Sequence, residues 1–163
     1  MQKIKIKAAL NLNNKFSKIQ DVLVSKLKII DTPGGSVLHG MKESDSGYKG
    51  FGEAYFSRIS FDSIKAWKRH NKMTLNLIVP IGEIRFVVYD NRADSSSKGI
   101  FSEYCLSVQN YSRLTIPPGL WVGFQGVSKK ESMLLNIANI PHDPDELDRT
   151  DIDNIKYNWE LKK

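Results

Sequence analysis

The stretch from Ile64 to Asp90 constrains the fold of this chain more than any other. It opens with IKAWKRH, continues into the apolar run 75–79, and after a Pro-x-Gly turn reaches a β-branched and aromatic run at 84–89. Short runs of such residues, bounded by proline and glycine, are typical of strands. We therefore expect consecutive strands here that line the core of the domain.

Lys68 and His70 stand two residues apart in this stretch, beside Trp67. Residues i and i+2 of a strand project from the same face, so the two side chains are expected to point together. One interpretation is a pocket with a cation and an imidazole at its wall. The other is a buried hairpin whose Lys68 and His70 merely face solvent, and the spacing leaves both open.

The rest of the chain also predicts short strands, with little room for helices. Asp31–Gly35 (DTPGG) is a strong turn signal, and 142–153 is an acidic loop or a short helix. Some eight or more short strands at regular spacing indicate an all-β sandwich or barrel. The further candidate strands are 22–30, 36–41, 51–59, 101–108, 114–116, 121–127 and 132–137.

The N-terminal sequence KIKIKAAL alternates lysine with apolar residues and predicts an edge strand or an arm that pairs with a second subunit. We expect residues 1–21 to form this arm, 22–163 to form one domain, and the protein to be a homodimer. Residues 1–30 contain seven lysines and one acidic residue, Asp21. The net charge of this segment is therefore +6, which equals the net charge of the whole chain. Because nucleic-acid binding needs basic residues over the folded face, nucleic acid is not an expected partner.

Composition excludes several classes of protein. With 163 residues, 40% hydrophobic and 26% charged, the chain has the make-up of an ordinary globular domain. A single cysteine, Cys105, cannot form an internal disulfide, which favours a reducing compartment. No apolar run reaches the roughly 20 residues of a membrane-spanning helix, and no signal-peptide core is present. We therefore expect a cytoplasmic protein without a membrane partner.

Common catalytic motifs are missing too. The sequence contains neither common type of glycine-rich phosphate loop and no Gly-x-Ser-x-Gly elbow. Three histidines and one cysteine are too few for a tetrahedral structural zinc site. We expect no cofactor and no metal.

The order of several motifs resembles the deoxysugar epimerase family of cupin jelly rolls, over residues 22–159. The similarity is carried by turn 31–35, strand 53–57 with its serine, Lys65–His70 (KAWKRH), and four later segments. These segments are Gly82 with Tyr89–Arg92 (YDNR), Leu106–Ser107 with Asn110, Ile116–Phe124 (IPPGLWVGF), and the closing Ile155-x-Tyr157-x-Trp159. The resemblance implies a cupin-type double-stranded β-helix, that is, a jelly-roll barrel.

Three reactive positions of that family are changed in this chain. The histidine that serves as general base falls on Lys68, a second histidine falls on Val122, and the acidic tyrosine falls on Leu135. The resemblance implies an isomerase or epimerase of a nucleotide-linked 4-keto-6-deoxy sugar in surface polysaccharide biosynthesis. With the opposite-face acid replaced, a one-carbon epimerisation or a keto-isomerisation fits better than the family's double reaction. The alternative is a non-catalytic protein that binds sugar nucleotides.

The surviving residues suggest roles for this chemistry. Removing a proton beside a ketone needs a base and a cation near the enolate oxygen, so His70 and Lys68 are the catalytic candidates. Each also has a plainer interpretation, as a structurally bonded imidazole and a solvated charge. The substrate-binding candidates are Lys65, Arg58 and Arg92 for phosphate, Tyr55 as a replacement acid, Trp121 for stacking, and Ser57 and Asn136 as polar contacts.

Overall fold

The computed structural model describes residues 19–161, and its regular structure is almost entirely β-strand. The first half contains β1 (Leu23–Lys26), β2 (Ile29–Thr32), β3 (Gly35–Leu38), β4 (Glu53–Ile59), β5 (Ile64–His70) and β6 (Leu75–Ile81). The second half contains β7 (Glu83–Tyr89), β8 (Phe101–Ser107), β9 (Ser112–Ile116), β10 (Trp121–Gly126), β11 (Ser132–Ala138) and β12 (Leu147–Arg149). Two short 3-10 helices, η1 (Pro144–Glu146) and η2 (Ile152–Asn154), lie on either side of β12.

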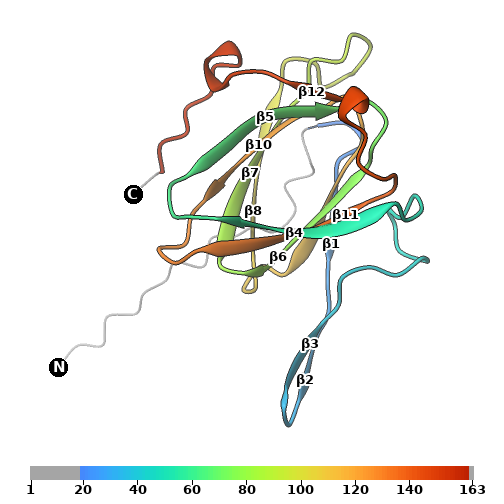
Figure 1. The fold of residues 1–163 in the computed structure, drawn as a ribbon, viewed down its shortest axis with the longest axis vertical. Coiled ribbons are helices and arrows are strands. Elements are labelled where there is room, and N and C mark those ends of the chain that lie inside the picture. The colour runs from blue at the N-terminus through green and yellow to red at the C-terminus, as the bar shows by residue number, and fades with distance from the viewer. Residues whose placement is uncertain (1–18, 162–163) are drawn as a thin grey trace, which may run out of the picture.

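Two five-stranded antiparallel sheets face each other (Figure 1). The first sheet has the order β1-β9-β6-β11-β4, and the second has the order β12-β5-β10-β7-β8. From β4 onward the chain crosses between the sheets after nearly every strand, which is the connectivity of a jelly roll. The expected all-β jelly-roll barrel is confirmed.

The core fills the space between the sheets. Alternate residues of each strand point inward, so Leu77 and Leu134 of the first sheet pack with Phe86, Val88 and other buried residues of the second. The outer face of the second sheet carries a separate cluster of buried residues, and the C-terminal tail covers it. This outer cluster consists of Trp67, Val87, Trp121 and Trp159.

The tail is held against the outer cluster by specific contacts. The buried Arg85 guanidinium donates to the carbonyl oxygens of Trp159 and Glu160. A Cβ atom on Gly123 would lie 2.7 Å from the Cβ of Ala66 and 2.8 Å from the Trp159 ring. A residue without a side chain is therefore required where the tail crosses β10.

The hairpin β2–β3 projects from the body as a separate two-stranded sheet (Figure 1). Its turn is the predicted DTPGG sequence, and Thr32 pairs with Gly35 across it. Apart from half-buried Leu38, every residue of the two strands is exposed, including the apolar Ile29, Ile30 and Val37.

Two sequence expectations differ from the structure. The single strand predicted at 22–30 is wrong, because the chain turns after β1 and residues 29–32 enter the projecting hairpin instead. The acidic segment 142–153 was expected as a loop or a short helix, but it also contributes β12 to the edge of the second sheet. The KIKIKAAL segment lies outside the described residues. Within residues 19–161, no helix has the length and apolarity needed to cross a membrane.

Candidate active site

One wall of the candidate site is the inner face of β5. Lys68 pairs with Val122 across β10, and Lys65 pairs with Phe124. Directly paired residues project from the same face, and both partners pack into the core between the sheets. A register shift between Val122 and Phe124 explains how residues three apart share this face. His70, two residues beyond Lys68, joins them, as the spacing predicted; the roles of these side chains stay a prediction.

The opposite wall comes from β4 and β11 of the first sheet. Tyr55 pairs with Asn136, and Ser57 pairs with Leu134, whose side chain is in the core. The three polar side chains therefore face the space between the sheets. Leu135, where the resemblance put the family's acidic tyrosine, points to the other face of β11. Tyr55 is thus the tyrosine that this wall offers.

His70 is anchored by Glu146, the last residue of η1. The Nδ1 atom of His70 and the Oε1 atom of Glu146 form a short contact. The other carboxylate oxygen, Oε2, accepts from the backbone amides of Asn71, Lys72 and Met73 over 3.0–3.2 Å. Burial by itself raises the pKa of Glu146, but the bond to His70 and these amide bonds outweigh it and hold the pKa below its usual range. A fixed carboxylate therefore holds the imidazole at the end of β5.

A group of cations lies beside this pair. Lys65 donates to the carbonyl oxygen of Arg58 over 3.1 Å and thereby joins the second sheet to the first. Lys68 faces Arg149 of β12 across the strand pair, and neither forms an ion pair with a carboxylate of residues 19–161. Burial lowers the pKa of the Lys68 ammonium, and the charges of Arg149 and Lys65 lower it further. Lys65, Lys68 and Arg149 are all exposed, and their uncompensated positive charge favours an anionic ligand.

Two other sequence candidates point away from this wall. Arg58 pairs with Glu131 over 3.0 Å, and both side chains are largely exposed. Trp121 is in the outer cluster, where the Arg69 guanidinium lies 4.8 Å from its ring centroid. The structure does not bring either residue to the inner faces.

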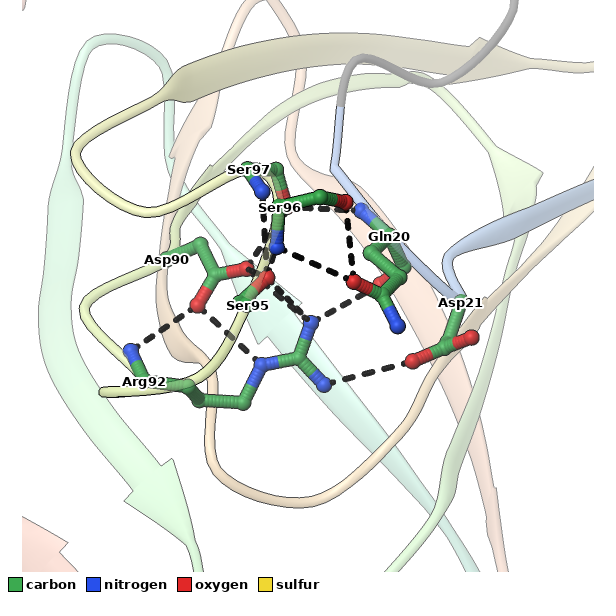
Figure 2. A network of polar contacts seen from close by, with 7 residues as sticks. All are labelled: Gln20, Asp21, Asp90, Arg92, Ser95, Ser96 and Ser97. Atoms are coloured by element: carbon green, nitrogen blue, oxygen red, sulfur yellow. Dashed lines mark hydrogen bonds and ion pairs between the residues drawn. The ribbon is translucent and has the colours of Figure 1, made fainter.

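Arg92 belongs to a polar network that ties the start of the described chain to the loop after β7 (Figure 2). Its guanidinium donates to both carboxylate oxygens of Asp90 over 3.0–3.1 Å, and to the carbonyl oxygen of Gln20 over 3.0 Å. Asp90 is fully buried and also accepts from Ser95 and Ser97. Arg92 is thus occupied by protein partners.

Glu146 and Arg149 are residues of the site that sequence reasoning missed. They stand 76 residues or more along the chain from the β5 residues they face. Their segment was predicted as an acidic loop or a short helix, and no spacing rule connects it to His70. Only the pairing of β12 with β5 brings them there.

No metal site is evident in the part of the chain that the structure describes. Residues 19–161 contain no group of three or more His, Cys, Asp or Glu side chains placed to hold an ion. The expected absence of a metal stays a prediction.

Known proteins resemble this chain in sequence and structure. A dTDP sugar isomerase from Desulfovibrio desulfuricans is 35% identical, covers 87% of this chain and 92% of its own, and superposes with a TM-score of 0.84. The chain belongs to the RmlC-like family of sugar epimerases and isomerases. No family model matches it.

Two further proteins resemble this chain, one in sequence and one in fold alone. The spore coat polysaccharide biosynthesis protein SpsL of Bacillus subtilis is 27% identical over 145 residues, which is 86% of this chain and 96% of that protein. The dTDP-4-dehydrorhamnose 3,5-epimerase of Elizabethkingia anophelis is only 14% identical. It shares the RmlC-like fold with a TM-score of 0.76, over 91% of this chain and 86% of its own.

Proposed function

We propose that this protein is an isomerase that acts on a nucleotide-linked 4-keto-6-deoxy sugar by removing a proton next to the ketone. The observation that carries the proposal is the inner wall of β5. There an imidazole anchored by a buried carboxylate lies two residues from a lysine that has no acidic partner among residues 19–161.

This arrangement suits formation of an enolate. His70 is the general base, and Lys68 neutralises the negative charge that develops on the ketone oxygen or binds the diphosphate. Lys65 and Arg149 add positive charge on the same wall for a substrate that carries two phosphates. Lysine binds phosphate as a point charge, so Lys65 and Lys68 can contribute without the bidentate geometry that arginine uses.

The reprotonation step assigns a role to the opposite wall. Tyr55 and Asn136 face the space between the sheets, and a phenol there can return a proton from the other side of the sugar. Ser57 on the same strand supplies a further polar contact. Because Lys68 and Leu135 stand where the family resemblance places its base and its acid, we assign epimerisation at a single carbon or a keto-isomerisation rather than the double reaction.

The relatives support the substrate class and the process. The Desulfovibrio relative is named a dTDP sugar isomerase, and the Bacillus relative a polysaccharide biosynthesis protein. We therefore assign this protein to surface polysaccharide biosynthesis. The single cysteine, Cys105, is free and half-buried, which fits our placement of the protein in the reducing cytoplasm.

We propose a homodimer in which hairpin β2–β3 packs on the second subunit. Its apolar residues Ile29, Ile30 and Val37 are exposed on a two-stranded sheet, which is marginally stable alone in water. The predicted pairing of the N-terminal arm with the second subunit stays a prediction, and Ile19, at the end of that segment, is buried in the core of its own domain.

One observation favours a second function. Lys68 stands where the family resemblance places the histidine base, so the protein could bind sugar nucleotides without turning them over. The test is solvent deuterium incorporation into nucleotide-linked 4-keto-6-deoxy sugars. The enzyme hypothesis expects exchange that His70→Asn lowers by roughly 100- to 10,000-fold, with binding nearly intact. Binding without exchange by the wild type would favour the accessory protein, and full exchange by His70→Asn would refute the base assignment.

A further inference from the structure

Glu146 contacts both the ring of His70 and the backbone amides of residues 71–73. We infer that Glu146 is a positioning residue that keeps His70 in the Nδ1–H tautomer and thereby presents the Nε2 lone pair to the space between the sheets. The effect on turnover rests on the proposed function; the tautomer itself does not.

The two carboxylate oxygens of Glu146 bind different partners. Oε2 accepts three backbone amides, those of Asn71, Lys72 and Met73, at 3.1, 3.0 and 3.2 Å. Oε1 is left for His70 Nδ1. Glu146 is 3% exposed, so water does not compete for these positions.

An ionised carboxylate can only accept hydrogen bonds. Nδ1 of a neutral His70 must therefore carry the ring proton, and the lone pair is on Nε2. Within residues 19–161, no residue hydrogen-bonds Nε2, and Nε2 is not among the buried polar atoms without a partner. The nitrogen that is free to accept a proton is thus also the accessible one.

The three amides make Glu146→Gln an unusually sharp test. A glutamine offers one oxygen and one NH2 group, and the three amide donors require the oxygen. The NH2 group must then face His70 Nδ1, which can only accept from it. The ring proton is forced onto Nε2, and the base is blocked while the loop keeps its bonds.

The first measurement is the tautomer in the full-length protein labelled with 15N-histidine. Long-range 1H–15N correlation spectra at alkaline pH distinguish the protonated ring nitrogen from the unprotonated one. We expect the Nδ1–H form of His70 in the wild type and the Nε2–H form in Glu146→Gln, with His70→Asn identifying the resonance. A wild-type His70 in the Nε2–H form overturns the inference, whatever the variant does.

The second measurement is deuterium exchange into the keto sugar that the wild type turns over. Glu146→Gln should lose roughly 100- to 10,000-fold in exchange rate, as removal of the base does. The same acid-to-amide change in serine proteases costs about 10,000-fold through the wrong tautomer. Binding of dTDP should change less than twofold.

Asp148→Asn is the matched control. Asp148 lies two residues further along in β12 and binds Arg69 over 2.8–3.0 Å on the outward side. Its replacement should leave both tautomer and exchange unchanged. A Glu146→Gln protein that exchanges like Asp148→Asn, with the wild-type tautomer retained, overturns the inference. A wild type in the Nδ1–H form without exchange on any substrate refutes the proposed function and leaves the positioning role standing.

Discussion

Tyr55 and Asn136 lie directly opposite each other on β4 and β11, and the Asn136 side-chain amide donates to the Tyr55 hydroxyl over 2.6 Å. Burial raises the pKa of Tyr55, and this hydrogen bond only partly opposes the rise. The phenol therefore keeps its proton at neutral pH, as a general acid must. The Asn136 Oδ1 atom is buried without a hydrogen-bond partner among the described residues.

Tyr55→Phe should separate the two half-reactions. It removes the proton donor but leaves His70, so deuterium exchange at the α-carbon should continue while conversion to the product falls roughly 100-fold or more. NMR in D2O follows both. Tyr89→Phe is the control, because Tyr89 stacks on Phe101 against the outer cluster, with ring centroids 4.3 Å apart. Loss of exchange in Tyr55→Phe would show that Tyr55 is not solely the acid.

Lys68→Met and Arg149→Met should each weaken the binding of dTDP. A hydrogen bond to a charged group contributes about 1.5–3 kcal/mol, so each loss is expected to raise Kd by roughly 10- to 100-fold. Lys68→Met should also slow exchange. Isothermal titration calorimetry measures binding, and Arg58→Met is the comparison because Arg58 already pairs with Glu131. Equal losses of dTDP affinity in all three variants would indicate a general effect of positive charge rather than binding at the inner wall of β5.

Disruption of the hairpin should abolish the dimer. The double change Ile30→Asp and Val37→Asp puts two charges at opposed positions of β2 and β3, where an apolar interface cannot accept them. Light scattering at micromolar concentration should show a dimer for the wild type and a monomer for the variant. Deletion of residues 1–10 should weaken the dimer. Ile152→Asp, at the exposed η2, should not, and a monomeric wild type would refute the proposal.

Asp90→Asn should reduce stability in a pH-dependent way. Burial by itself raises the pKa of Asp90, but hydrogen bonds from Arg92, Ser95 and Ser97 outweigh it and hold the pKa well below its usual range. The carboxylate therefore stabilises the fold above about pH 4, its unfolded-state pKa, and this contribution is lost as the pH falls below that value. Breaking the buried ion pair should cost about 3–5 kcal/mol at neutral pH.

Urea unfolding at several pH values tests this expectation. The difference between Asp90→Asn and wild type should shrink as the pH falls below about 4. Asp31→Asn, in the exposed hairpin, is the control and should change the free energy of unfolding by less than about 0.5 kcal/mol. A difference that does not vary with pH would show that the Asp90 charge is not what stabilises the network.

The sequence by itself determined most of the strands and one wall of the site. Strand periodicity follows from the alternation of side chains along each segment, so β4 to β11 were predicted close to their observed bounds. The shared face of Lys68 and His70 follows from the same two-residue repeat. The placement of Ser57 and Tyr55 on one face was implicit in the spacing of β4.

Only the tertiary structure decided which of these residues meet. Arg92 was predicted to bind phosphate, but in the folded chain Gln20 and the buried Asp90 bind its guanidinium. Glu146 reaches His70 because β12 pairs with β5, a contact between segments about 76 residues apart. Local sequence fixes the direction of a side chain relative to its own strand, whereas its partners depend on how distant strands pair.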